Sequence, residues 1–584
     1  MTIATAFCPA AGSTERPNLG IQRPQGYWQG VSREQGFVQD FVYVRINRAA
    51  IGPALVSFLL TALVVAAAWW WLGAPVKLPP SPLLAGEKLP CVSYAPFRGS
   101  QDPLVEGTRV SAAQIDEDLA ILAKYTRCIR TYSVDDSRDD VLKSARRYGL
   151  KVLHGVWVSA DPDKTQRQIA TSVAYAKDYP DVIAAIVVGN EVLLRGEMTA
   201  ANLISIIRGI KAQVAVPVTY ADVWEFWLRY PDVQSAVDFI TIHVLPYWED
   251  FPIPASSAAA HLVAIHNRLA SAFPGKDIVI GEFGWPSAGR MREAARPSRS
   301  NQALAIIEAL AAAKHENIRL NIIEAFDQPW KRALEGAVGG YWGVIDRATN
   351  APKFSFDGGV VSDHPDWPLQ ALAGVILAAL TFASAFIAGR KKGFSAHIWA
   401  RIGLLAVVPA VLIGWTIESM LVDSFSAATW LRSLAFAATA AVAPIVCAAA
   451  CAARRPVPAF ASLLGGAGAR RDWLDWLLGA TLIALMVLAV EAALGLVFDP
   501  RYRDLPFAPL IGAVVPFLVL SAMTRGPAGS RGMAEMVAAA VVAVSALYIV
   551  VNETLSNWQS VLFCGGLVVL AITLLTARAA PSSE

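Results

Sequence analysis

Eight long apolar runs constrain this chain more than any other feature of its sequence. The first, IGPALVSFLLTALVVAAAWWWL, covers residues 51–72 without a charge, and seven more lie near 368–389, 397–421, 431–452, 473–497, 507–523, 533–551 and 559–577. Apolar segments of about 20 residues match the thickness of a bilayer core. The residues before the first run are too many for a signal peptide, so we expect a tail over residues 1–50 followed by an uncleaved anchor. The chain is predicted to cross a membrane eight times.

Basic residues predict the orientation of these helices. With a cytoplasmic N-terminus, the later cytoplasmic loops carry ten basic residues: Arg390, Lys391, Lys392, Arg454, Arg455, Arg470, Arg471, Arg525, Arg531 and Arg578. The opposite loops carry Arg501 and Arg503, with Arg432 at a boundary. Because Lys and Arg concentrate in cytoplasmic loops, we expect both termini in the cytoplasm and residues 73–367 outside it.

Composition excludes several classes of function. A hydrophobic content of 55% agrees with a membrane protein, and a net charge of +3 over 584 residues gives no argument for binding nucleic acid. The closest pair of histidines, His261 and His266, is five residues apart and does not share a helix face. We therefore expect neither a metal site nor a cofactor.

Between the first two apolar runs the sequence changes to that of a soluble domain. Residues 73–90, with five prolines, are predicted to be a semi-rigid linker. In residues 91–357, apolar runs alternate with helical patterns, and the expected strands are 91–96, 128–133, 151–158, 181–189, 216–221, 237–243, 277–283 and 320–326. Eight buried parallel strands favour an α/β fold, a (β/α)8 TIM barrel, beside an all-α transmembrane region over 368–577. A doubly wound open sheet is the alternative, but no glycine-rich phosphate loop follows the first strand.

Polar side chains concentrate at the ends of these strands, where barrels of this kind carry their active sites. They are Tyr94, Arg130, Tyr132, Asn190, Glu191, Asp222, His243, Glu282, Glu324 and Asp327. Glu191 and Glu282 end the fourth and seventh strands, which are not neighbours, so the two carboxylates are expected to face each other across the barrel mouth. Paired carboxylates suit glycoside chemistry, in which one protonates the departing oxygen and the other attacks the anomeric carbon.

Aromatic residues follow the last four strands: Trp224, Trp227, Tyr247, Trp248, Trp285, Trp330, Tyr341 and Trp342. Pyranose rings pack on aromatic faces, so we interpret this cluster as a sugar-binding wall. The alternative is that the rings fill the core or face the membrane.

Five motifs in this order, VVGNEVLLRGE, ADVWEFW, HVLPYW, GEFGWPS and EAFDQPWK, closely resemble glycoside hydrolase family 17, which contains β-1,3-glucanases and β-1,3-glucanosyltransferases. The resemblance runs from Tyr94 to about Asp346 and does not include the apolar runs. It implies a retaining mechanism with Glu191 as acid/base, Glu282 as nucleophile and Asn190 on the sugar 2-hydroxyl. It also implies that Tyr94, Arg130 and Tyr132 support or contact the sugar at the nucleophile.

One position departs from the family, which usually has FDE-x-x-K after the last strand. Here the segment is FDQPWK, so Gln328 replaces an acid, whereas Lys331 and Glu335 match. The neutral amide removes a charge beside Lys331, and it leaves open how Lys331 is paired.

The order of anchor, barrel and several spans is similar to bacterial membrane-bound members of the family linked to β-glucan assembly. This resemblance implies a bacterial inner-membrane protein with its barrel in the periplasm, acting on a β-glucan beside the lipid bilayer, with a separate glucan synthase as partner. The chain is not itself expected to be a synthase, because its cytoplasmic loops are short and it contains no Arg-Trp pair. Transfer to a glucan acceptor, hydrolysis as an endo-β-1,3-glucanase, and non-catalytic glucan binding or export remain open. We favour transfer.

Cysteines and intramembrane acids add two questions. Cys91 and Cys128 begin adjacent predicted strands, where a disulfide and a buried thiol pair are both open. Glu418 and Glu491 lie within or near the spans, either as functional groups or as acids paired at the interface.

Overall fold

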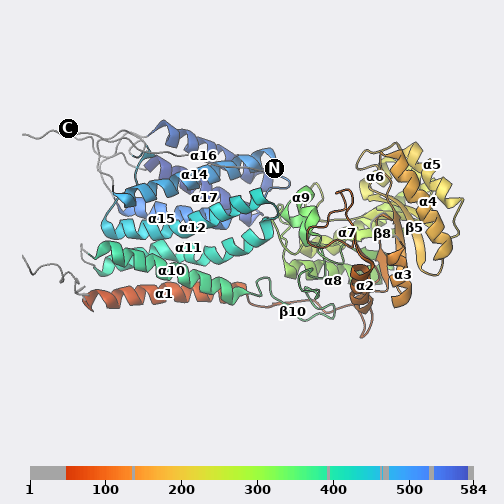
Figure 1. Cartoon of the computed structure of the whole chain (residues 1–584), viewed down its shortest axis with the longest axis horizontal. Helices are drawn as coiled ribbons and strands as arrows, with labels where there is room; N and C mark the ends of the chain where they lie inside the picture. Colours follow the sequence, from red (N-terminus) through yellow and green to blue (C-terminus); the bar gives the residue numbers. More distant parts are fainter. Residues whose placement is uncertain are drawn as a thin grey trace, which may run out of the picture. The chain divides into compact units, whose positions relative to one another are not determined.

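The computed structural model describes residues 48–134, 139–390, 395–460, 463, 472–524 and 532–576 (Figure 1). The predicted N-terminal tail lies almost wholly outside these ranges. So do seven of the basic residues used to predict orientation: Lys391, Lys392, Arg470, Arg471, Arg525, Arg531 and Arg578.

Eight parallel strands close into a barrel in chain order. They are β2 (Val92–Ser93), β3 (Cys128–Arg130), β4 (Lys151–Val156), β5 (Ile183–Asn190), β6 (Val218–Val223), β7 (Ile240–His243), β8 (Ile278–Phe283) and β9 (Arg319–Ile322). Each overlaps one predicted strand, and pairing of Val92 with Ile322 closes the ring. The TIM barrel is confirmed, and the open sheet is excluded because the barrel has no free edge.

Helices follow the strands on the outside of the barrel (Figure 1). They are α2 (Ala112–Tyr125), α3 (Asp140–Tyr148), α4 (Pro162–Asp178), α5 (Ala200–Lys211), α6 (Trp224–Arg229), α7 (Ala258–Ala272), α8 (Arg299–Glu316) and α9 (Arg332–Glu335). Several begin at side chains that accept a hydrogen bond from the first turn, as Ser111, Asp161, Thr199 and Ser298 do. The strands pack beneath these helices, which explains why all six residues of β8 are buried.

The remaining helices are long and apolar. They are α1 (Arg48–Leu72), α10 (Trp367–Gly389), α11 (Ala396–Asp423), α12 (Ala427–Ala453), α14 (Trp473–Phe498), α15 (Phe507–Met523), α16 (Met533–Glu553) and α17 (Trp558–Thr576). Among the described residues, seven are long and apolar enough to cross a membrane, and α15 is a shorter apolar helix of 17 residues. All eight predicted spans are helical, and seven of them meet the length expected of a membrane span.

The predicted linker pairs with another part of the chain. Its strand β1 (Val76–Lys77) pairs antiparallel with β10 (Val360–Val361), which follows the barrel. Leu78 is 5% exposed and Leu89 is 1% exposed, so parts of the linker pack against the protein. The segments that enter and leave the barrel are therefore joined at their base.

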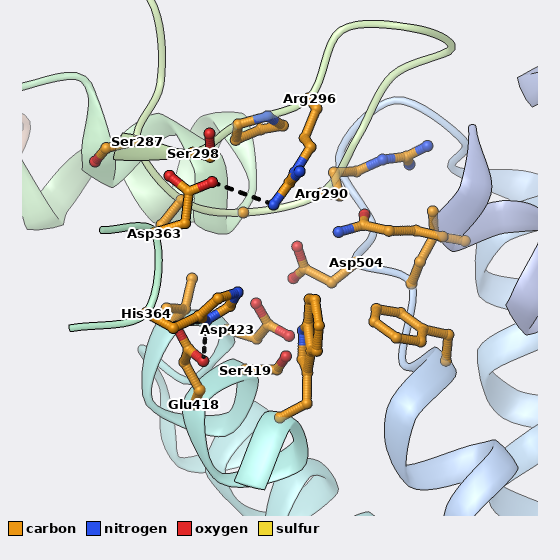
Figure 2. A pocket seen from close by; sticks show the side chains of 18 of the residues that line it. Ser287, Arg290, Arg296, Ser298, Asp363, His364, Glu418, Ser419, Asp423 and Asp504 are labelled. Atoms are coloured by element: carbon orange, nitrogen blue, oxygen red, sulfur yellow. Dashed lines mark hydrogen bonds and ion pairs between the residues drawn. The ribbon is translucent and has the colours of Figure 1, made fainter. Parts of the chain in front are cut away.

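The loop after β8 contacts segments that connect the apolar helices. Arg290, 3% exposed, donates hydrogen bonds from Nη1 to the carbonyl oxygens of Pro500 and, at 2.8 Å, Arg503, and its Nη2 pairs with Glu553. The Met291 amide donates to Gln559 Oε1 at 2.8 Å. A polar cavity of about 100 Å³ lies beside these contacts (Figure 2), lined by residues that include Arg290, Arg296, Asp363, His364, Glu418 and Asp504. Glu418, whose role was left open, pairs here with His364 Nδ1 at 2.8 Å.

Candidate active site

Irregular strand pairing precedes both predicted catalytic glutamates. The register of β5 against β6 shifts between Val187 and Asn190. The register of β8 shifts on both sides, between Ile242 and His243 against β7 and between Ile280 and Phe283 against β9. Such irregularities re-aim a side chain at the rim of a barrel. They turn Glu191 and Glu282 toward the mouth.

The turn at Glu191 requires an unusual backbone. Glu191 has a φ of 54°, and Gly189 has a φ of 84°. A Cβ atom on Gly189 would lie 2.7 Å from Val192 Cγ2, so the glycine of VVGNE is sterically required. The Glu191 amide donates to the Ala221 carbonyl at 2.8 Å. Left-handed backbone at a non-glycine residue is costly, and surrounding contacts must hold it in place.

Gly281, directly before Glu282, leaves space for the side chains of Thr241 and His243. A Cβ atom on Gly281 would lie 2.4 Å from Thr241 Cγ2 and 3.3 Å from the His243 ring. No larger residue fits beside His243 without displacing it.

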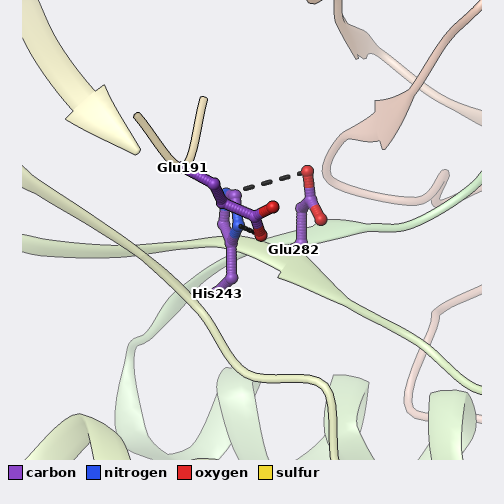
Figure 3. A group of neighbouring side chains, drawn as sticks. All are labelled: Glu191, His243 and Glu282. Carbon is purple, nitrogen blue, oxygen red and sulfur yellow. Dashed lines mark hydrogen bonds and ion pairs between the residues drawn. The ribbon is translucent and has the colours of Figure 1, made fainter. Parts of the chain in front are cut away.

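His243 lies between the two carboxylates (Figure 3). Its Nδ1 is 2.8 Å from Glu191 Oε1, and its Nε2 is 3.7 Å from Glu282 Oε1. A carboxylate oxygen of each glutamate and a ring nitrogen of His243 lie within 4.8 Å of one another. Retaining glycosidases hold their carboxyl groups about 5–5.5 Å apart, and inverting ones about 6.5–9.5 Å. An approach of the nearest oxygens to within 4.8 Å is closer to the retaining range than to the inverting range.

The two glutamates differ in their surroundings. The side chain of Glu191 is 24% exposed and that of Glu282 is 5% exposed. Arg130 Nη1 and the Tyr132 hydroxyl each donate to Glu282 Oε1 at 2.8 Å. Burial raises the pKa of Glu282, but His243, Arg130, Lys331 and the Tyr132 hydrogen bond together hold it below its usual value. These contacts therefore favour the ionised form of Glu282.

Arg130 also connects strands β5 and β8. Its Nη2 donates to Asn190 Oδ1 at 2.6 Å, and its Nη1 donates to the Gly281 carbonyl at 2.9 Å. Since the Asn190 amide oxygen is used by Arg130, its amide nitrogen is left to donate to an oxygen of a substrate.

A second charged group lies next to Glu282. Lys331 Nζ is 3.3 Å from Glu324 Oε2, so Lys331 keeps a carboxylate partner although Gln328 is neutral. Burial, only partly offset by Lys331, raises the pKa of Glu324 to about 7. Burial also raises the pKa of Glu335, and the negative charges of Glu191 and Glu282 act in the same direction. Gln328 instead donates to the Ala95 carbonyl at 3.0 Å and accepts from Trp330 Nε1 at 2.9 Å.

Three predicted polar residues are buried among protein partners. The Tyr94 hydroxyl donates to Asp118 at 3.0 Å, and Asp327 pairs with Lys353 at 2.6 Å. Asp222 accepts hydrogen bonds from the Tyr220 hydroxyl and the Val223 amide, and burial raises its pKa to about 6, with Glu191 adding to the rise. Tyr94 and Asp327 thus have protein partners among the described residues, and their roles at a sugar stay predictions.

Burial also changes the interpretation of the aromatic cluster. Trp285, Tyr247 and Trp342 are 0%, 0% and 2% exposed. Trp285 Nε1 donates to the Arg296 carbonyl at 2.9 Å, and the Tyr247 hydroxyl donates to the Arg290 carbonyl at 2.9 Å. None of the three offers an open ring face, so the prediction that they form a sugar-binding wall is wrong for this structure; they support the loops of the mouth. Trp248 and Trp330 remain partly exposed.

Sequence reasoning missed Trp157 and Arg195. Trp157 is the next-to-last residue of the predicted strand 151–158 and is partly exposed, and the Arg195 guanidinium lies 4.5 Å from its ring centroid. Arg195 also donates to the Asn190 carbonyl. The signal was available, since Trp157 occupies the same strand-end position as the residues that were singled out.

Glu191, His243 and Glu282 lie close enough to hold a cation. However, Arg130 and Tyr132 already donate to the Glu282 oxygen that such an ion would bind. The donor set suits a carboxylate held by protein partners better than a metal ligand.

Known proteins resemble the barrel. Residues 91–343 match the BtgE/BtgC glycoside hydrolase domain, so the barrel is a glycoside hydrolase domain. A glucan 1,3-beta-glucosidase of Arthroderma benhamiae is 28% identical over 274 residues, which cover 43% of this chain and 87% of that protein. One of Saccharomyces cerevisiae is 25% identical over the same shares. A solved family 17 β-1,3-glucanosyltransferase of Rhizomucor miehei is 24% identical over 46% of this chain and 96% of its own, with a TM-score of 0.41.

Proposed function

We propose that the barrel acts on β-1,3-glucan by a retaining mechanism, with Glu282 as nucleophile and Glu191 as acid/base. The observation that carries this proposal is the separation of the two carboxylates, whose nearest oxygens lie within 4.8 Å. The substrate is proposed from the named activity of the two fungal relatives.

In the first step Glu282 attacks the anomeric carbon while Glu191 gives its proton to the departing glycosidic oxygen. The bond to the leaving sugar breaks, and a glucosyl ester of Glu282 forms. In the second step Glu191, now ionised, takes a proton from a hydroxyl of the acceptor or from water, and the new oxygen displaces Glu282.

The surrounding residues have distinct parts in these steps. Arg130 and Tyr132 keep Glu282 ionised and aimed before attack. His243 orients Glu191 through its Nδ1 contact. Asn190 donates to the sugar 2-hydroxyl, where hydrogen bonds strengthen in the transition state. Trp248 and Trp330 are among the predicted rings that remain partly exposed and could contact sugar.

The acceptor in the second step decides between transfer and hydrolysis. We propose transfer to a glucan acceptor, which elongates, branches or cyclises the polymer. It is supported by the attachment of the barrel to apolar helices, since an enzyme that only digests polymer gains little from being anchored. Endo-hydrolysis and non-catalytic glucan binding or export are the alternatives.

We place the barrel on the periplasmic side of a bacterial inner membrane, with both termini in the cytoplasm and a separate membrane glucan synthase as supplier of the polymer. The distribution of basic residues supports this orientation. Cys91 and Cys128 form a disulfide, which agrees with an oxidising compartment.

Chemical rescue of the full chain in detergent tests the mechanism. With an aryl β-glucoside of a short β-1,3-linked oligosaccharide, azide should restore turnover to Glu282→Gly as an α-glycosyl azide and to Glu191→Ala as a β-glycosyl azide. Full turnover by Glu191→Gln on unactivated β-1,3-glucan would disprove the assignment. Mass spectrometry of products from an unactivated oligosaccharide then separates transfer, which gives longer products, from hydrolysis, which gives only shorter ones.

A further inference from the structure

The loop between α14 and α15, residues 499–506, reaches the barrel at Trp248. Arg501 Nη2 donates to the Trp248 carbonyl at 3.3 Å, and its guanidinium lies 5.7 Å from the centroid of the Trp248 ring. The Tyr502 ring meets the Trp248 ring edge-on, with centroids 5.9 Å apart. A segment that connects two apolar helices therefore touches Trp248, a partly exposed aromatic residue that follows strand β7.

The loop is fixed in this position by buried contacts. Arg290 binds the carbonyl oxygens of Pro500 and Arg503, and Glu553 balances its charge. Gly336, with a φ of 73°, lies so close that a Cβ atom there would be 2.3 Å from the Tyr502 carbonyl oxygen. The approach of the loop thus depends on glycine at a position of the barrel.

The side chains that the loop presents are open. Tyr502 is 40% exposed although it belongs to an aromatic cluster with Trp248 and the buried Trp342. Among the described residues, the Arg501 guanidinium has the Trp248 carbonyl as its hydrogen-bond acceptor, whereas Arg503 pairs with Asp499 at 3.3 Å. An open ring beside a guanidinium with unused donors is chemistry that binds a neutral sugar.

Trp248 lies a short distance from His243 at the proposed catalytic centre. Trp248 lies five residues beyond His243, which contacts Glu191, so their Cα atoms are at most about 18 Å apart. This distance corresponds to a few sugar units of an extended chain.

We infer that Tyr502 and Arg501 of the α14–α15 loop form, with Trp248, a distal glucosyl subsite, so that the membrane region supplies part of the substrate cleft. The inference rests on the proposed function. It adds that kcat/KM of the enzyme depends on the length of the glucan. The inference therefore predicts that a hexasaccharide gains more from this subsite than a trisaccharide does.

Steady-state kinetics of the full chain in detergent on β-1,3-linked trisaccharide and hexasaccharide test the inference. Tyr502→Ala and Arg501→Ala should each lower kcat/KM for the hexasaccharide about fivefold to tenfold, through KM, and leave that for the trisaccharide unchanged. Tyr502→Phe, which keeps the ring, should retain most of the preference for the longer substrate. Arg503→Ala is the matched control in the same loop, since its side chain pairs with Asp499 and does not contact Trp248.

The possible results separate the two proposals. Equal losses on both substrates would assign Tyr502 and Arg501 a structural role and overturn the subsite, as would an unchanged length dependence. If the unmodified chain turns over neither substrate, the proposed function fails and the inference fails with it.

Discussion

Arg130 and Glu282 form a buried ion pair at the centre of the barrel mouth, with 2.8 Å between Nη1 and Oε1 and side chains that are 1% and 5% exposed. Because the guanidinium also binds Asn190, one side chain influences both the charge of Glu282, the proposed nucleophile, and the position of the amide beside Glu191, the proposed acid/base.

Removing the charge of Arg130 should move the acid limb of the pH profile. Glu282 must be ionised to attack, and its pKa lies below the usual value in part because of Arg130. In Arg130→Met that pKa rises, so kcat/KM should begin to fall at a pH roughly one unit or more higher than in the unmodified enzyme. Arg130→Lys keeps the positive charge but loses the paired hydrogen-bond donors of the guanidinium, so it should shift the acid limb by a smaller amount. An unchanged acid limb in Arg130→Met would mean that Arg130 does not control the nucleophile.

Adding one methyl group at Gly281 should disrupt the site. In Gly281→Ala the new Cβ meets Thr241 and the His243 ring, so we expect kcat to fall at least about 100-fold and the free energy of unfolding to fall by about 1–3 kcal/mol. Gly209→Ala is the control, because Gly209 lies within helix α5 with no atom within 4 Å of the new Cβ. It should keep full activity and gain about 0.5–1 kcal/mol of stability. Near-normal activity of Gly281→Ala would show that the site tolerates displacement of His243.

Glu324 should make the barrel less stable as the pH rises. Its pKa is raised to about 7 in the folded protein from 4.5, so the folded state binds this proton more tightly than the unfolded state. The stabilisation is present below about pH 4.5 and is lost as the pH rises through about 7, on the order of 3 kcal/mol. Glu324→Gln cannot titrate, so its thermal midpoint in detergent should fall less between pH 5 and pH 8. Identical pH dependence in the two proteins would contradict a raised pKa.

Reduction of the bond between Cys91 and Cys128 should weaken the barrel. The bond closes a loop with a sequence separation of 37 residues, and loops of this size gain about 2–4 kcal/mol from such a bond. Thermal unfolding with and without a reductant measures the loss. The Cys91→Ser, Cys128→Ser double variant should be as unstable as the reduced protein and should no longer respond to the reductant. A response that persists in the double variant would point to a different origin.

The barrel could be predicted from sequence because its signals are local. Near-continuous apolar runs such as residues 277–283 mark buried strands, and a carboxylate near the C-terminal end of such a run, as at Glu282, lies at the strand end. The pairing of Glu191 with Glu282 followed from the order of strands in a closed barrel.

The rest depended on contacts between distant segments. Whether an indole faces solvent or protein is decided by its neighbours in space, so Trp285 and the partly exposed Trp157 could not be told apart by position along the chain. The partner of Lys331 was uncertain for the same reason, since Glu324 lies on the other side of a turn from Gln328. The contact of Tyr502 with Trp248 joins residues 254 positions apart, so no local sequence pattern indicates it.

The pairing of β1 with β10 has a consequence for how a polymer meets the enzyme. This short ribbon joins the segments that enter and leave the barrel, and Arg290 binds the barrel to the helices at a second place. Contacts at two separate places restrict rotation of the barrel against the helices. Under the proposed function, the mouth of the barrel would then face the membrane region in one orientation, and a glucan made at the membrane would enter it from a defined side.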